Sequence, residues 1–206
     1  ITVILTTIIT IFVLTGYTRK SLAAILGTVS GVVISGIAAW LFGKVSGISG
    51  YNVSNIDNLV SVANCTNIKI GDLLFAGILI SSLGAVMDVG LSVASTITEI
   101  HDVNPELNVG ELFRRGMNVG KDMMGTMANT LILAFAGGSL SELLLDYAYN
   151  LPYLQIVNSY TIGIELMRGI AGSIGIILTV PLVSLFASVL IKFEFIYRPV
   201  ISQDTV

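Results

Sequence analysis

The chain has few charged residues. They make up 11% of its 206 residues, whereas hydrophobic residues make up 54% and the mean hydropathy is +0.89. Soluble globular domains carry about 25% charged residues, so the composition excludes that class. Lipid is therefore the expected surroundings of most of the chain, and we predict an integral membrane protein. The net charge of −3 adds little, because orientation in a membrane depends on how Lys and Arg are shared between loops.

Cysteine and histidine are nearly missing. The single Cys65 excludes an internal disulfide, a Cys-based zinc site and an iron–sulfur cluster. The single His101 excludes the histidine clusters that hold metals or form catalytic triads. The sequence also lacks the GxSxG, Walker and HExxH motifs. We therefore expect no metal, no cofactor and no enzymatic activity.

Apolar stretches fill most of the chain. It begins at Ile1 inside one of them, without Met or a basic segment, which we interpret as a fragment or a processed chain. Because a membrane-spanning helix takes about 20 residues, we predict an all-α, polytopic bundle of about five spans, at 1–17, 21–43, 72–98, 121–138 and 162–196. We expect an outer loop at 44–70, a cytoplasmic connector at 99–120, and an interfacial or re-entrant segment at 139–160.

Basic residues in short loops predict the orientation. One side of the predicted bundle holds most of them: Arg19, Lys20, Arg114, Arg115, Lys121, Lys192 and Arg198. The other side holds Lys44, Lys69 and Arg168. We therefore expect a cytoplasmic C-terminus. The connector around Arg114 and Arg115 fits the lipid headgroup layer rather than nucleic acid.

Small residues recur at helical spacing on two predicted spans. The first stripe is Ala23, Gly27, Gly31, Ser35 and Ala39. The second begins with Gly77, Ser81 and Gly84 and continues on the same helix face through Asp88, Ser92, Ser95 and Glu99. Such stripes let two helices approach closely, so we predict helix packing for both.

Asp88 in the second stripe is the main candidate for a functional residue. A charge at the bilayer centre costs at least about 2.5 to 3.5 kcal/mol, so we do not expect it to face lipid. Counting residues from the span ends places Asn129 at a similar depth on the following span, flanked by Thr126 and Thr130. Two interpretations stay open: a carboxyl group that exchanges a proton in a polar core, and a protonated acid that joins two helices.

Arg168 is another candidate partner for Asp88. Glu165 lies three positions before it on the same predicted helix, however, and side chains at this spacing meet readily. The spacing therefore favours a local Glu165–Arg168 pair.

Two segments carry a family resemblance. GAVMDV and GKDMMGTMANTLIL are the specific parts of the stretches 71–101 and 111–140, which resemble the YibE/F-like family of bacterial multispanning membrane proteins. The resemblance covers about residues 18–199. It implies a bacterial inner membrane protein.

A weaker similarity is to the membrane half of SecD and SecF, in the RND superfamily of proton-driven transporters. It rests on the order of Gly84 to Asp88, Glu99, Asp122 and Asn129-Thr130-Leu131-Ile132, followed by a Gly-rich last span. The similarity implies that Asp88 matches the acid of their fourth span. It also implies a half-unit that pairs with another.

Two hypotheses on function follow. The first is a transport or export-assisting protein that resembles a SecD/SecF half, is proton-coupled through Asp88, and pairs as a homodimer or with a related membrane subunit. The second is a non-catalytic assembly subunit whose stripe at 23–39 binds a helix of a partner. Neither hypothesis specifies a substrate.

Overall fold

A computed structural model describes residues 2–48 and 70–192 of the chain. Predictions about Cys65, Lys69, Arg198 and most of the outer loop lie outside these residues. The described part consists of helices α1 (Thr2–Thr15), α2 (Arg19–Val45), α4 (Ile70–Val103), α5 (Val109–Gly138), α6 (Leu140–Ala148), α7 (Tyr153–Val157) and α8 (Tyr160–Lys192). No strand is present between these limits, so the predicted all-α class is confirmed.

Three of these helices, α2, α4 and α8, are long and apolar enough to cross a membrane. The described residues hold a fourth candidate span if α5 and α6, between which the helix axis bends by 42°, are counted as one. The apolar helix α1 has 14 residues, which is about 21 Å against the roughly 30 Å of a bilayer core. The membrane character of the chain is thus supported, whereas the predicted five-span arrangement is not.

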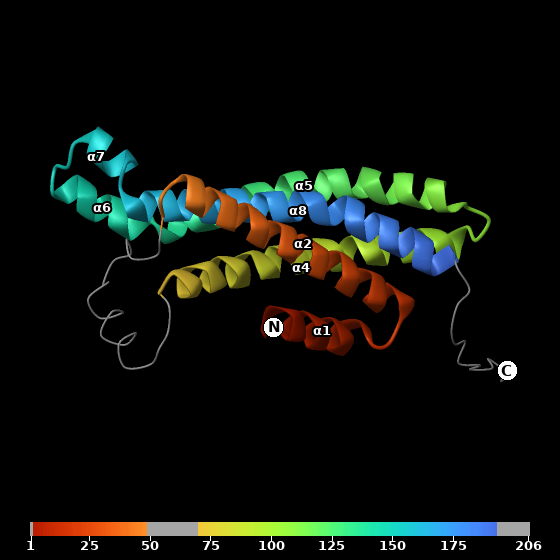
Figure 1. Ribbon diagram of the computed structural model, residues 1–206. Coiled ribbons are helices and arrows are strands. Elements are labelled where there is room, and N and C mark those ends of the chain that lie inside the picture. Colours follow the sequence, from red (N-terminus) through yellow and green to blue (C-terminus); the bar gives the residue numbers. More distant parts are fainter. Residues whose placement is uncertain (1, 49–69, 193–206) are drawn as a thin grey trace.

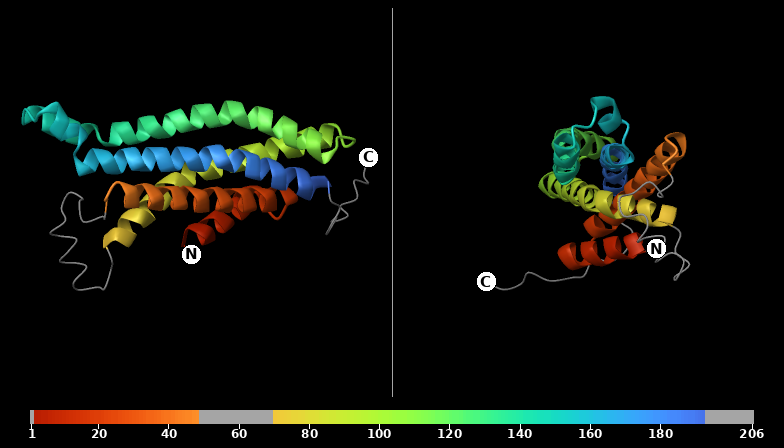
Figure 2. Two further views of the ribbon diagram at one scale, coloured as in Figure 1. Left: turned by 45° about the horizontal axis from the view of Figure 1, so that its top comes forward. Right: turned by 90° about the vertical axis from the view of Figure 1, so that its left-hand side faces the viewer.

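Helix α8 lies at the centre of the bundle, surrounded by α2, α4 and α5 (Figures 1 and 2). Contacts of Gly27 with Val183 and of Gly31 with Thr179 place α2 antiparallel to α8. A Cβ atom on either glycine would overlap its neighbour, so the helices pack too closely for any larger residue. The predicted packing stripe of α2 is buried in this contact: Ala23, Gly27, Gly31, Ser35 and Ala39.

Helix α5 begins earlier than the sequence predicted. Asn108 and Glu111 form a capping box, with Asn108 Oδ1 accepting from the Glu111 N–H at 2.9 Å. From there the helix runs unbroken to Gly138, so only residues 104–108 connect α4 to α5, in place of the connector expected at 99–120. Gly116 and Gly120, which pack against Ser184 and Val180 of α8, explain the difference. Lys121 and Asp122 therefore lie near the midpoint of α5 rather than at its start.

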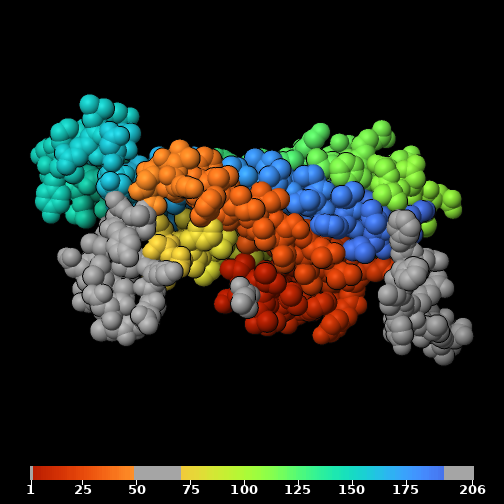
Figure 3. All heavy atoms as spheres, in the orientation of Figure 1, coloured from red at the N-terminus to blue at the C-terminus, as the bar shows by residue number. Residues whose placement is uncertain are grey.

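The core lies where α2, α4, α5 and α8 meet. Its fully buried side chains are mainly β-branched: Val86, Val89, Val93, Ile97, Ile176, Val180 and Val183. The two ends of the bundle differ: α6 and α7 project beyond one of them (Figure 3), and the 104–108 connection and Lys192 lie at the other (Figure 1). These are called the α6–α7 end and the Lys192 end below.

Candidate functional site: the polar face of α4 and α5

Asp88 lies near the midpoint of α4 with its side chain exposed. The core-facing positions around it are held by Val86, Val89 and Gly90, which are buried. Two positions along a helix turn the side chain by about 200°, so Asp88 points away from the core that Val86 fills. The expected burial of Asp88 in a polar core is therefore not found within the single chain.

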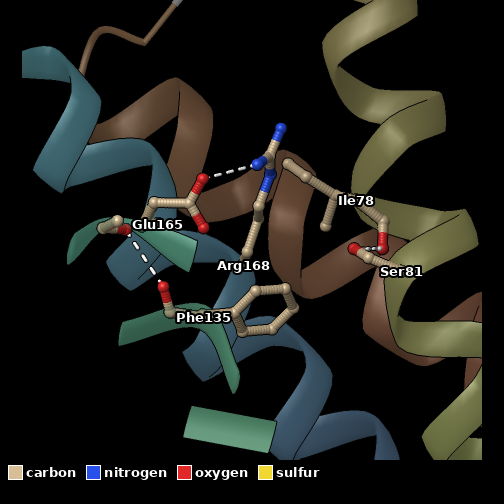
Figure 4. A network of polar contacts seen from close by, with 6 residues as sticks. Ile78, Ser81, Phe135, Glu165 and Arg168 are labelled. Carbon is tan, nitrogen blue, oxygen red and sulfur yellow. Dashed lines mark hydrogen bonds and ion pairs between the residues drawn. The ribbon is translucent and has the colours of Figure 1, made fainter. Parts of the chain in front are cut away.

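The small residues that precede Asp88 lie on the same outer face. Ser81 is exposed, and its hydroxyl donates to the Ile78 carbonyl at 3.0 Å (Figure 4). A Cβ atom on Gly77 or Gly84 would meet no atom within 4 Å. The packing predicted for Gly77, Ser81 and Gly84 is thus not made in the part of the chain that the structure describes, unlike the packing of the α2 stripe.

The predicted neighbours of Asp88 on α5 are also exposed. The Thr126 hydroxyl donates to the Asp122 carbonyl at 3.2 Å, and the Thr130 hydroxyl donates to the Thr126 carbonyl at 2.9 Å. Between residues 70 and 192, no hydrogen bond or ion pair joins Asp88 to Thr126, Asn129 or Thr130. The structure therefore places these residues at exposed positions of α4 and α5 without bringing them into contact.

One contact between α4 and α5 relates the depths of these residues along the bundle. Helices α4 and α5 are antiparallel, and Ile97 contacts Gly116. Asp88 lies nine residues from Ile97, and Gly125 lies nine residues from Gly116, both toward the α6–α7 end. Asp88 and Gly125 are therefore at about the same depth along the bundle. Asn129 lies one turn, or about 6 Å, beyond this level.

Three further polar residues of α5 are exposed: Asn118, Lys121 and Asp122. We expected this region to be a connector in the lipid headgroup layer. A signal for a helix was present in the sequence, because Gly116 and Gly120 are four residues apart and such pairs line helix contacts. The residues on the opposite side of the helix then face outward. The outward positions of α4 are Gly77, Ser81, Gly84 and Asp88, and those of α5 are Asn118, Lys121, Asp122, Gly125, Thr126, Asn129 and Thr130; Gly77 is half-buried and the others are exposed.

The predicted pair of Glu165 and Arg168 is confirmed. Arg168 Nη1 donates to Glu165 Oε1 at 2.6 Å near the start of α8 (Figure 4). Beside it lies an apolar cavity of about 320 Å³, lined by Phe135, Leu143 and Ile162 among others. Arg168 is thus engaged locally, and this cavity offers few polar groups to a charged solute.

Buried hydroxyl groups join the central helices. The Ser35 hydroxyl of α2 donates to the Ala171 carbonyl of α8 at 3.0 Å and lies 3.3 Å from the Ser82 hydroxyl of α4. Thr28, Ser184 and Ser188 have buried hydroxyl oxygens with no hydrogen-bond partner among the described residues. Sequence reasoning did not single these out, because isolated Ser and Thr residues are common in membrane helices. Within residues 2–48 and 70–192, no three His, Cys, Asp or Glu residues group closely enough to hold a metal ion.

Comparison with known proteins agrees with the family resemblance. The sequence matches the YibE/F-like protein family over residues 1–193. No curated protein and no solved structure matches the chain, and nothing in these comparisons supports the similarity to SecD and SecF. Because the match covers nearly the whole sequence, the chain belongs to the YibE/F-like family.

Proposed function

We propose that this chain is a membrane subunit of a transport or export-assisting system in which Asp88 takes up and releases a proton. One observation carries the proposal: a carboxylate is exposed at the midpoint of a helix that is long and apolar enough to cross a membrane. A charge in that position is costly against lipid, and acids at such depth mark ion and proton paths.

The packing of the bundle supports a path on its surface rather than through its core. Gly31 and Gly175 allow α2 and α8 to pack so closely that an added Cβ atom would overlap Thr179 or crowd Ser35. The space next to Gly84 and Gly125, by contrast, is open. The bundle therefore leaves the space beside Asp88 unfilled on the outer side of α4.

The test is the removal of the titratable group at constant shape. We expect Asp88→Asn to lower proton flux into vesicles loaded with a pH-sensitive dye at least tenfold, and Asp88→Glu to retain part of it. Asp72→Asn, which changes an exposed acid in the first turn of α4, is the matched control. Full flux in a correctly folded Asp88→Asn variant contradicts the proposal.

A non-catalytic assembly subunit is the second candidate function, and one observation changes the surface on which it would bind a partner. The α2 stripe is already covered by α8 of the same chain, so a partner helix must bind elsewhere, and the uncovered stripe of α4 is suited to it. In this case Gly84→Leu abolishes co-purification of the partner, whereas Asp88→Asn leaves function unchanged.

A further inference from the structure

We propose that the apolar cavity between α5, α6 and α8 binds the acyl chain of a fatty acid, whose carboxylate is bound by Arg168. The inference goes beyond the proposed function, because it concerns another part of the bundle and does not depend on Asp88. Four observations at the α6–α7 end carry it: the lining of the cavity, its opening, the outward side of α6, and the position of Arg168.

The cavity is almost entirely apolar and has room for one chain. Its volume is about 320 Å³, at the small end of the roughly 300 to 1,000 Å³ that ligand pockets have. Phe135 and Ala136 of α5, Leu143 of α6 and Ile162 of α8 contribute to its walls. Apolar cavities of this kind hold no ordered water and accept apolar ligands, so the lining favours a hydrocarbon chain.

The cavity opens on the outer surface of the bundle. Three of its lining side chains are about half exposed: Ile132 of α5, and Leu166 and Ile170 of α8. Helix α8 is long and apolar enough to cross a membrane, and large apolar side chains on the outside of such a helix face lipid. A chain can therefore enter from the bilayer without passing through the packed core.

Helix α6, which forms one wall, has its apolar side outward. Leu140, Leu144 and Leu145 are more than half exposed, whereas the acids of the same helix, Glu142 and Asp146, are half-buried. A helix on the surface of a soluble protein shows the reverse, with its charged side chains toward the solvent. Hydrocarbon is therefore the expected surroundings of α6, and an acyl chain is the occupant that such surroundings supply.

Arg168 places a cation at the edge of the cavity. Glu165, which lines the cavity, accepts a hydrogen bond from Arg168 Nη1 at 2.6 Å (Figure 4). The guanidinium has five N–H donors, and this is its one hydrogen bond within the described residues. The Arg168 side chain is 29% exposed. A carboxylate matches the fork of donors on a guanidinium, so the charge beside the cavity favours a fatty acid over an uncharged chain.

The depth of Arg168 suits the carboxylate of a fatty acid. A Cβ atom on Gly43 of α2 would lie 3.7 Å from Met167 Sδ of α8, so the end of α2 is level with the start of α8. There Lys44 lies over the Trp40 ring at 5.2 Å, and both residue types anchor helices at a membrane interface. A fatty acid keeps its carboxylate at this depth, so it can reach Arg168 without moving its charge into hydrocarbon.

Photolabelling in membranes tests the proposal. The probe is palmitic acid with a diazirine group on its chain, and mass spectrometry identifies the labelled segments. Ala136→Phe fills the cavity that Ala136 lines, and Ala134→Phe, at an exposed position of the same helix outside the cavity lining, is the matched control. We expect Ala136→Phe to lower the labelling of residues 132–143 and 162–170 at least tenfold, and Ala134→Phe to leave it unchanged. Equal labelling of the two variants overturns the cavity as the site.

Competition in the unsubstituted protein gives a result that does not depend on the folding of any variant. Excess unlabelled palmitate should displace the probe from both segments, and labelling that does not saturate overturns the proposal. Displacement by phosphatidylglycerol vesicles but not by palmitate overturns the fatty acid as the ligand.

A last comparison tests the role of Arg168. We expect Arg168→Gln to lower labelling by the acid probe at least fivefold and to leave labelling by its methyl ester unchanged, because the ester carries no charge. Equal effects on the acid and the ester overturn the binding of the carboxylate by Arg168. Asp88→Asn should not change the labelling, so the failure of this proposal and the failure of the proposed function are separate results.

Discussion

At the scale of single residues, the buried hydroxyls of α8 and α2 have opposite effects on stability. Ser184 Oγ is buried without a hydrogen-bond partner, so its desolvation is not compensated. Ser35, in contrast, donates to the Ala171 carbonyl and lies beside the Ser82 hydroxyl. We expect Ser184→Ala to raise, and Ser35→Ala to lower, the free energy of unfolding by about 0.5 to 1.5 kcal/mol. Thermal unfolding of purified protein in detergent measures both. A loss of stability in Ser184→Ala would show that its hydroxyl has a partner.

The sequence predicted where Asp88 lies along its helix but not the direction in which its side chain points. Its place near the middle of an apolar helix followed from the sequence, because the uncharged stretch around it is long enough to cross a membrane. Its direction did not follow, because both sides of α4 carry small residues. Gly90 packs beside Thr28 and Val86 beside Gly31, so the neighbouring helices, rather than the pattern on α4, determine which side is buried.

At the scale of helices, the two stripes of small residues differ in what they contact. Gly27 lies against Val183 of α8, and an added Cβ atom would come within 2.9 Å of the Val183 Cα atom. Because backbone atoms cannot yield as side chains do, we expect Gly27→Leu to destabilise the bundle by about 3 kcal/mol or more. Gly84→Leu serves as the matched control, since its side chain enters open space. Monodispersity and melting temperature in detergent measure the difference, and equal losses in the two variants contradict the assigned packing.

The helices also show why the sequence predicted some elements better than others. The apolar pattern predicted α2, α4 and most of α8, because long uncharged runs leave few alternatives. It predicted the second half of α5 as a span at 121–138, but placed the first half, which carries Arg114 and Arg115, in a connector. Contacts made through Gly116 and Gly120, together with the buried Leu112, place that half in the bundle. Tertiary packing therefore makes this segment part of a long helix, although its hydropathy indicated a connector.

At the scale of the whole molecule, the distribution of basic residues predicts which end of the bundle faces the cytoplasm. The Lys192 end holds Arg19, whose guanidinium donates to the Ile191 carbonyl at 3.4 Å, and Lys192, which donates to the Pro105 carbonyl at 3.1 Å. The connection at 104–108 therefore lies at the basic end. At the α6–α7 end, Lys44 lies over the Trp40 ring at 5.2 Å, an anchor typical of a membrane interface.

We therefore expect the Lys192 end to face the cytoplasm. In a Cys65→Ala background, Glu106→Cys should react with a membrane-impermeant maleimide only in inverted vesicles, and Gln155→Cys only in intact cells. Both positions are exposed and lie at opposite ends of the bundle. Labelling both from one side would contradict the up-and-down arrangement of α5, because this helix separates them. The reverse pattern would leave the fold intact and invert the orientation, which would place Arg19 and Lys192 outside, against the bias of basic loops in membrane proteins.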